Sequence, residues 1–238
     1  MQVLVGTSGY SYKEWKGTFY PEDLKAAGML RYYAERLGTV EINNTFYRMP
    51  TATVLEHWAA ETPPGFIFVL KGPQRITHMK RLKDAAEPLA YFLDTAIVLG
   101  EKLGPVLFQL PPNFKKDLAR LQDFLALLPA GRPVAFEFRH ESWFDDEVYG
   151  ALREKGVALC AADTDEFGDR GAPIVPTAGF GYLRLRRADY DDAALAAWAE
   201  RIRAQPWTRA FVFFKHEDAG KGPAMAARFV AALAAGDR

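Results

Sequence analysis

Two glutamates and two histidines lie where they could transfer protons. Glu41 and Glu137 each lie near the end of a short apolar run, and His78 and His140 follow such runs within the next loop. A carboxyl group in partly apolar surroundings can have its pKa raised enough to act as an acid or a base near neutral pH. We therefore predict that these four residues are catalytic. The alternatives are salt bridges to neighbouring cations for the glutamates and local loop hydrogen bonds for the histidines.

Basic, amide and aromatic residues recur in the same polar clusters and could bind a substrate. Arginine suits planar oxyanions, and aromatic rings suit sugar rings or nucleobases. The predicted binding residues are Asn43, Tyr47, Lys71, Gln109, Arg139, Trp143, Tyr182, Arg184, Arg186 and Lys215. This mixture indicates a small anionic substrate that is derived from a carbohydrate.

Two segments near the C-terminus could together bind phosphate. Arg184 and Arg186 end one apolar run, and residues 220–223, with the sequence Gly-Lys-Gly-Pro, precede the last helical stretch. In many barrel enzymes the loops after the seventh and eighth strands bind phosphate with backbone amides. The alternative is a tight turn beside solvated arginines, because Gly-Lys-Gly alone is not a phosphate-binding motif.

Metal and imine chemistry are two further alternatives. The chain has metal-ligand residue types at Glu41, Glu137, Asp163, His140 and His216. It lacks a compact spacing such as H-E-x-x-H, and the neighbouring arginines and lysines repel a cation. We therefore predict no cofactor and keep a divalent metal as an alternative. Lys71 or Lys215 could form a Schiff base if buried and neutral.

The elements that must position these residues alternate along the chain. Short runs rich in β-branched and aromatic residues predict strands at 3–5, 39–42, 66–70, 106–110, 134–138, 157–161, 181–185 and 210–214. Apolar residues at helical spacing predict helices at 24–37, 51–60, 88–103, 117–128, 145–155, 191–204 and 225–234. This alternation predicts an α/β fold, a (β/α)8 TIM barrel that forms one domain over residues 1–238. The connection 163–179 is rich in glycine and proline, so we expect its helix to be short or absent.

The alternation of side chains along a strand decides which candidates point into the barrel. In the fifth strand, Val134, Phe136 and Phe138 suit an apolar helix layer, which leaves Glu137 pointing inward. The same argument turns inward Glu41, Asn43, Lys71, Gln109, Arg139, Tyr182, Arg184, Arg186 and Lys215. All of these lie toward the carboxyl ends of their strands, where barrel enzymes form their active sites.

Composition excludes several classes of protein. The 238 residues include 30 basic and 30 acidic side chains, so a net charge of zero gives no evidence for a broad nucleic-acid or membrane footprint. Cys160 is the only cysteine, which excludes an intramolecular disulfide. No apolar run reaches the roughly 18 residues of a membrane span, and the N-terminus shows no targeting segment. We expect a soluble, cytoplasmic protein with no membrane partner, and its oligomeric state stays open.

Six motifs resemble those of a known family. They are Gly6-Thr7-Ser8-Gly9-Tyr10, Glu41-Ile42-Asn43-Asn44-Thr45-Phe46-Tyr47, Lys71 with Ile76-Thr77-His78, Gln109-Leu110-Pro111-Pro112, Glu137-Phe138-Arg139-His140 and Tyr182-Leu183-Arg184-Leu185. Together they resemble the YecE-like family, or domain of unknown function 72, over nearly the whole chain. The resemblance implies a TIM barrel and the pocket residues given above. The family has been loosely compared with sugar isomerases, and the resemblance implies no particular reaction.

Two functions are therefore expected from the sequence. The first is a cytoplasmic barrel enzyme that isomerises or hydrolyses a small anionic, carbohydrate-derived substrate at the carboxyl ends of its strands. The alternative is a protein that binds a nucleotide or single-stranded nucleic acid without catalysis, through an aromatic and basic barrel mouth.

Overall fold

Eight parallel strands close into one barrel in the computed structural model, which describes residues 1–48, 50–164, 173–215 and 218–235. The strands are β1 (Gln2–Ser8), β2 (Thr39–Ile42), β3 (Ile67–Lys71), β4 (Leu103–Gln109), β5 (Val134–Glu137), β6 (Ala158–Asp163), β7 (Phe180–Leu185) and β8 (Arg209–Phe214). Each strand pairs in parallel with the next one in the chain, and β8 pairs with β1. The predicted (β/α)8 barrel is confirmed.

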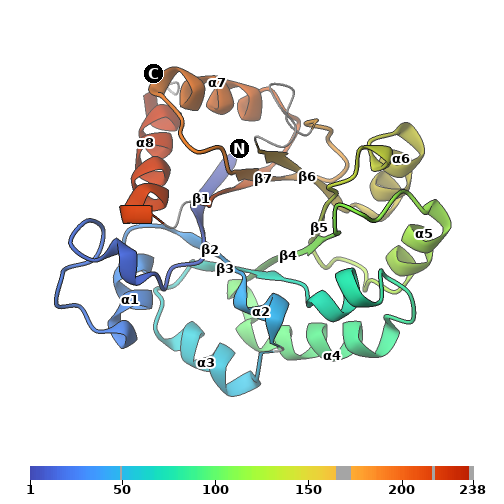
Figure 1. The fold of residues 1–238 in the computed structure, drawn as a ribbon, viewed down its shortest axis with the longest axis horizontal. Coiled ribbons are helices and arrows are strands. Elements are labelled where there is room, and N and C mark those ends of the chain that lie inside the picture. Colours follow the sequence, from blue (N-terminus) through green and yellow to red (C-terminus); the bar gives the residue numbers. More distant parts are fainter. Residues whose placement is uncertain (49, 165–172, 216–217, 236–238) are drawn as a thin grey trace.

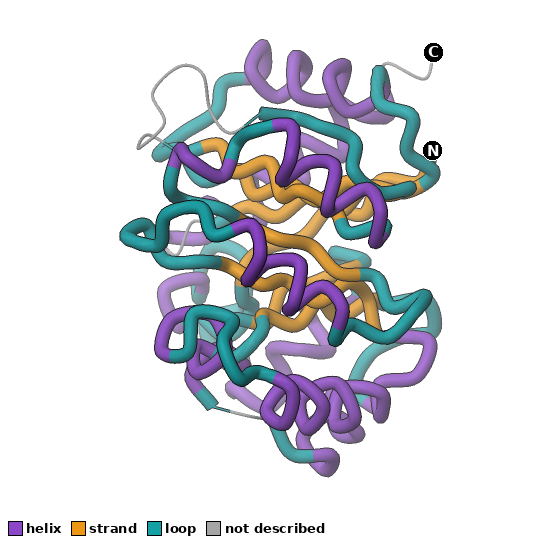
Figure 2. The backbone as a smooth tube through the Cα atoms, turned by 90° about the vertical axis from the view of Figure 1, so that its right-hand side faces the viewer, coloured by secondary structure: helices purple, strands orange, loops and turns teal. Residues whose placement is uncertain are grey.

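Helices surround the strands (Figure 1). The longer ones are α1 (Met29–Ala34), α3 (Ala52–Ala60), α4 (Ala86–Ala96), α5 (Leu118–Ala126), α6 (Asp146–Lys155), α7 (Asp192–Arg203) and α8 (Lys221–Ala235). Short turns lie in the connections, namely η1 (Lys13–Trp15), η2 (Ala26–Gly28), α2 (Asn44–Tyr47), η3 (Arg75–Met79), η4 (Ile97–Lys102), η5 (Glu141–Trp143) and η7 (Asp218–Gly220). Seen from the side, the strands run through the middle of the molecule with helices around them (Figure 2).

Short polar side chains fix where four of the helices begin. In each case the backbone amide three residues further along the chain donates to the side chain of the capping residue. The distances are 3.4 Å to Thr51, 3.1 Å to Asp117, 3.0 Å to Asp145 and 2.7 Å to Asp191. Each cap satisfies one of the amides that the first helical turn leaves unpaired. The four predicted helix starts at these residues are therefore confirmed.

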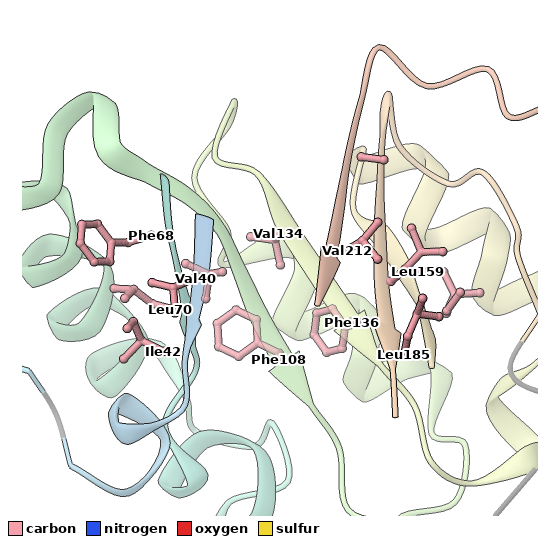
Figure 3. Packing of buried hydrophobic residues seen from close by; sticks show 14 of the residues in the cluster. Val40, Ile42, Phe68, Leu70, Phe108, Val134, Phe136, Leu159, Leu185 and Val212 are labelled. Carbon is pink, nitrogen blue, oxygen red and sulfur yellow. The ribbon is translucent and has the colours of Figure 1, made fainter. Parts of the chain in front are cut away.

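Apolar layers pack on both faces of the strands. The layer between strands and helices includes Val40, Phe68, Phe108 and Phe136 (Figure 3). The barrel interior is filled by Val69, Leu107, Ala135, Ala158, Cys160, Tyr182, Phe211 and Phe213. The predicted alternation in the fifth strand is confirmed, because Phe136 lies in the first layer and its neighbour Ala135 in the second. Charged inward residues follow this interior layer, so they collect at the carboxyl ends of the strands.

The structure differs from the sequence-based elements in a few places. β4 begins at Leu103 instead of residue 106, and its register with β3 shifts over this stretch, where Gly104 and Pro105 lie. Proline is tolerated at such an irregularity because its missing N–H interrupts no ladder bond there. In the connection before β7, residues 173–179 form no helix, as expected, and residues 165–172 lie outside the described part. No described helix is both long enough and apolar enough to cross a membrane.

Candidate functional site

A buried network joins three strands at their carboxyl ends. Arg184 of β7 lies between Glu41 of β2 and Glu137 of β5, with N···O distances of 2.8 Å and 2.5 Å. The hydroxyl of Tyr182 donates to the second carboxylate oxygen of Glu41 at 2.6 Å. None of these four residues is more than 2% exposed. The side chains that strand alternation turned inward thus meet across the barrel.

Glu137 is surrounded by three arginines. Besides Arg184, Arg139 donates from Nε to Oε1 at 3.0 Å, and Nη1 of Arg186 lies 3.8 Å from the same oxygen. Burial raises the pKa of Glu137, but the three guanidinium groups together lower it to about 2. Glu137 is therefore ionised at neutral pH, where it cannot donate a proton as a general acid.

Lys71 reaches the same end of the barrel from β3 and is 9% exposed. Its Nζ lies 4.2 Å from the centroid of the Phe46 ring. Among the described residues, no hydrogen bond or ion pair joins this Nζ to another group. Burial lowers the pKa of Lys71, Arg184 lowers it further, and the glutamates offset only part of this, so that the pKa is about 8. Lys71 therefore has fewer hydrogen bonds and ion pairs to described residues than the arginines of the site.

His78 lies on the single π-helical turn η3, which follows β3. Its ring meets Phe46 edge to face, with centroids 4.9 Å apart, and Nδ1 lies 2.8 Å from Oγ1 of Thr77. Burial and the neighbouring cations Lys71 and Arg139 lower the pKa of His78 to about 4. The imidazole is therefore neutral at pH 7. Single π-helical turns are frequent at functional sites.

The described side chains of this site carry an excess of positive charge. Four cations, Lys71, Arg139, Arg184 and Arg186, face two carboxylates, Glu41 and Glu137. The excess is two positive charges when Lys71 is protonated. Arg139 and Arg186 are each 19% exposed, and the buried Nε of Arg186 has no hydrogen-bond partner. Guanidinium groups that are partly exposed and still have N–H groups to donate suit the binding of an oxyanion.

His140 and Trp143 take structural positions beside the site. The amide of Ser142 donates to Nδ1 of His140 at 3.2 Å, so this ring caps η5. Trp143 is fully buried, stacks on Phe138 with centroids 4.8 Å apart, and donates from Nε1 to the carbonyl of Phe114 at 2.6 Å. A ring with no exposed surface cannot contact a substrate in this conformation.

Three other predicted residues, Gln109, Tyr47 and Lys215, differ in how far they are buried. Gln109 ends β4 and is buried next to Glu137 in the strand register. Tyr47 is 73% exposed. Lys215 follows β8, is partly buried, and its amide donates to the carbonyl of Leu185 at 3.3 Å.

A cavity of about 370 Å³ opens between the loops that follow β1 and β2. It is lined by Gly9, Tyr10, Ser11, Tyr12, Ile42, Asn43, Asn44 and Trp58. Asn43 directly follows β2, has a helical backbone conformation at the start of α2, and lines this cavity. Hydroxyl, amide and aromatic groups in one cavity are the groups that bind sugar rings.

The two segments of the predicted phosphate site have different surroundings. Gly220 ends η7 and residues 221–223 begin α8, and Gly220 packs so closely on Thr18 that an added Cβ would lie 2.5 Å from its hydroxyl oxygen. Arg184 is held by its two glutamates. No hydrogen bond within the described part of the chain joins these two segments directly.

The donor set does not fit a divalent metal. Within the described ranges, no three His, Cys, Asp or Glu side chains are arranged to hold one. Asp163 lies on the helix-facing side of β6 and accepts from Arg187 at 2.7 Å and from Tyr190 at 2.9 Å. Glu41 and Glu137 hold an arginine between them, and its charge opposes a cation. His216 lies outside the described residues.

Phe46 and Thr77 are parts of the site that the candidate residues did not include. Phe46 contacts both Lys71 and His78, and Thr77 orients the imidazole. Both lie in helical turns, α2 and η3, that are too short to give a periodic pattern. Their only sequence signal is that each lies within the motifs quoted above.

Comparison with known proteins adds a family and a fold. The model of the family described as "Protein of unknown function DUF72" matches residues 4–238. The chain is 26% identical to the UPF0759 protein YunF of Bacillus subtilis (strain 168) over 185 residues, which are 73% of this chain and 64% of that protein. It is also similar to the crystal structure of a DUF72 family protein of Thermotoga maritima MSB8, with 29% identity and a TM-score of 0.86 over 98% of this chain and 100% of that chain. A DUF72 family protein of Enterococcus faecalis V583 has a TM-score of 0.80 at 19% identity, covers 98% of this chain and 96% of its own, and supports the fold alone.

Proposed function

The chain belongs to the DUF72 family, and on that premise we propose that its barrel binds a small anionic substrate at the carboxyl ends of the strands. Arg139 and Arg186 bind the anionic group, and Lys71 lies at the same end of the barrel. Arg184 holds the two buried glutamates and thereby fixes the strands that carry the site. The substrate is derived from a carbohydrate, and an isomerisation or a hydrolysis remains the expected reaction.

The excess of positive charge is the observation that carries this proposal. A buried cluster that served stability alone would balance its charges, because an unpaired buried charge is costly. Here Lys71 has no carboxylate partner, and Arg186 keeps a buried Nε–H without an acceptor. An anion would accept from this Nε–H and balance part of the excess positive charge.

The carbohydrate part of the proposal rests on the cavity beside Asn43. Phenol, hydroxyl and amide groups from the loops after β1 and β2 line it, within the same end of the barrel. Such groups exchange hydrogen bonds with sugar hydroxyls, while the rings of Tyr10 and Tyr12 offer flat apolar contact. An anionic sugar derivative could therefore use both the cationic cluster and the cavity.

The glutamates support the site instead of donating protons in it. Both oxygens of Glu41 and both of Glu137 accept from arginine or tyrosine donors. His78, which is neutral at pH 7, is the better candidate for proton transfer, since its pKa of about 4 leaves a ring nitrogen able to accept. Of the four predicted catalytic residues, we therefore propose His78 for proton transfer.

A thermal-shift titration tests the proposal. The protein is titrated with inorganic phosphate, sugar phosphates and the matching neutral sugars at constant ionic strength. A ligand that binds only the folded state adds about 2.7 kcal/mol of stability at a hundred times its Kd. We expect saturable stabilisation by the anions and little by the neutral sugars.

Matched variants locate the binding site. Arg186→Gln removes one anion ligand and should weaken phosphate binding about tenfold or more, or roughly 1.4 kcal/mol. Arg201→Gln, on the exposed surface of α7, is the control and should respond like the wild type. The proposal fails if neutral sugars stabilise equally well, or if Arg186→Gln binds phosphate as tightly as the control.

The nucleic-acid alternative receives less support from the rim. Trp143, which was predicted as a binding residue, is 0% exposed. Of the predicted aromatic binding residues Tyr47, Trp143 and Tyr182, Tyr47 is the one that is largely exposed. Mononucleotides in the same titration keep this alternative testable, because their binding would depend strongly on salt.

A further inference from the structure

We infer that Lys71 is a nucleophile whose amine forms an imine with the carbonyl carbon of a small anionic aldehyde or ketone. The inference rests on the proposed anion site, since Arg139 and Arg186 hold the anionic group while Lys71 meets the carbonyl. It narrows the substrate class to anions that also carry an aldehyde or a ketone. It also assigns the imine to Lys71 and not to Lys215, the other lysine that was considered from the sequence.

The backbone of Lys71 is fixed, and its amine is not committed to a partner. The residue pairs with Leu107 in the β3–β4 register, and the hydroxyl of Thr45 donates to its carbonyl at 2.6 Å. Its Nζ lies over the face of Phe46, 4.2 Å from the ring centroid, and the residue is 9% exposed. No described carboxylate lies within salt-bridge distance of Nζ. A nucleophilic amine needs this combination of a rigid support and an uncommitted nitrogen.

The charges around Lys71 favour its neutral, reactive form. Arg184 on β7 and Arg139 on β5 repel its proton, and Glu137 and Glu41 attract it. His78 on η3 is uncharged at pH 7 and has little influence. Burial is the largest influence, and together these groups lower the pKa of Lys71 to about 8. A lysine that is desolvated and close to other cations is one of the known ways in which proteins activate an amine.

The covalent step balances without a further reactant. The lone pair of the neutral amine attacks the carbonyl carbon, and the carbonyl oxygen takes a proton to give a carbinolamine. The C–O bond then breaks, the hydroxyl leaves as water with a second proton, and a C=N bond remains. No electrons are transferred to or from a third molecule, so neither oxidant nor reductant is needed. The product is a cationic imine once its nitrogen is protonated.

His78 is placed to move these protons. Its ring and the Nζ of Lys71 both contact the Phe46 ring, and the charge of Lys71 lowers the pKa of His78, so the two groups lie near each other. Once the neutral amine has attacked, the imidazole can accept the proton that the now cationic nitrogen loses and return it to the leaving hydroxyl. The Thr77 hydroxyl at 2.8 Å from Nδ1 orients the ring for this exchange. In this account His78 is a catalytic residue and Thr77 a positioning residue.

Reductive trapping tests the inference on the unmodified protein. The protein is incubated with pyridoxal 5′-phosphate, an anionic aldehyde, then reduced with sodium borohydride, and the modified lysines are identified by peptide mass spectrometry. Pyridoxal, which lacks the phosphate, is the matched control. We expect Lys71 to be the first lysine modified, about tenfold or more faster with the phosphate than without it. The rate should rise with pH as Lys71 loses its proton near pH 8.

Two variants, and inorganic phosphate as a competitor, distinguish a failure of the imine proposal from a failure of the anion-site proposal. Lys71→Arg keeps the positive charge and should lose the adduct, whereas Lys215→Arg should keep it. If Lys71 stays unmodified while phosphate still stabilises the protein, the imine is refuted and the anion site stands. If Lys71 reacts equally with both aldehydes and phosphate does not protect it, the nucleophile is supported and the anion site is refuted. The mapping of the wild type gives the decisive result even if Lys71→Arg folds poorly.

Discussion

Arg184 connects the two carboxylates that the barrel buries most completely. Its guanidinium is held on both sides, so it neutralises part of the charge of Glu41 and of Glu137. Removing one partner from a buried ion pair is far more costly than exchanging the whole pair for apolar groups, because the remaining charge stays buried and unpaired.

Replacing Arg184 should therefore destabilise the fold strongly. We expect Arg184→Met to lower the free energy of unfolding by about 3–5 kcal/mol at neutral pH, measured by urea denaturation. Adding Glu41→Gln and Glu137→Gln to that variant should restore much of the loss. Arg186→Gln is the matched control and should cost less than about 1 kcal/mol, since its nearest carboxylate oxygen is 3.8 Å away. An equal loss in the two single variants would contradict this account of the network.

Glu137 should give the fold a marked sensitivity to acid. Its pKa is about 2 in the folded protein against an ordinary value of 4.5, so its ionisation stabilises the fold above pH 4.5. That stabilisation is lost as the pH falls from about 4.5 toward about 2, and it amounts to roughly 3 kcal/mol. Denaturation curves between neutral pH and pH 3 should show a steeper loss for the wild type than for Glu137→Gln. Parallel curves would show that this carboxylate is not held by the arginines.

Lys71 should be a residue that lowers stability in favour of function. Its pKa of about 8 is below the ordinary 10.5, so stability is lost as the pH falls from about 10.5 through 8, and the full penalty is present at pH 7. Lys71→Met should then raise the free energy of unfolding at pH 7 by about 1–2 kcal/mol. Lys102→Met is the contrasting variant, because Lys102 donates to two carbonyls and one hydroxyl, at 2.7, 2.6 and 3.0 Å. It should destabilise the protein, and a loss of stability in both variants would contradict the assignment of Lys71.

At the scale of elements, the connection from β3 to α4 organises the site. It contains the π-helical turn with His78, followed by three non-glycine residues with positive φ, namely Arg81 at 48°, Leu82 at 68° and Asp84 at 46°. Such backbone conformations cost energy and gather at functional sites. The connection begins at Gly72, directly after Lys71.

Gly72 should be required for the position of Lys71. A Cβ at residue 72 would lie 2.5 Å from the ring of Phe108, which is itself packed in the helix-facing layer. Gly72→Ala should cost about 1–3 kcal/mol and weaken phosphate binding, because the end of β3 must shift. Gly150→Ala is the matched control, since a Cβ there meets nothing within 4 Å in α6. That control should gain up to about 1 kcal/mol and bind phosphate normally.

The order of the strands and of the longer helices could be predicted from the sequence. The short turns α2 and η3 could not. Strand alternation was sufficient to predict that Glu41, Lys71, Glu137 and Arg184 point toward one another. The reason is that all inward side chains of a closed barrel enter the same interior. The residues that pair and those that stay unpaired could not be predicted, since this depends on distances of a few tenths of an ångström between strands far apart in the chain. Trp143 shows the limit, because a loop aromatic can face a ligand or fill the space under its own loop.

At the scale of the whole molecule, charge is balanced overall and unbalanced locally. The chain has 30 basic and 30 acidic residues, yet the described site holds four cations against two carboxylates. A field of this kind concentrates small anions at one end of the barrel without making the whole surface basic. The family match over residues 4–238 and the TM-score of 0.86 indicate that the barrel itself is shared with its relatives.

The most direct test of the central claim is the affinity for inorganic phosphate. It is measured by calorimetry on the wild type and on a variant that combines Arg139→Gln with Arg186→Gln. Both substitutions leave Glu137 paired with Arg184, so the fold should persist. The account predicts saturable binding of one phosphate to the wild type and a loss of about a hundredfold or more in the variant, from two charge-assisted interactions of roughly 1.5 kcal/mol each. Phosphate binding that is equal in the two proteins would contradict the claim that these arginines form the anion site.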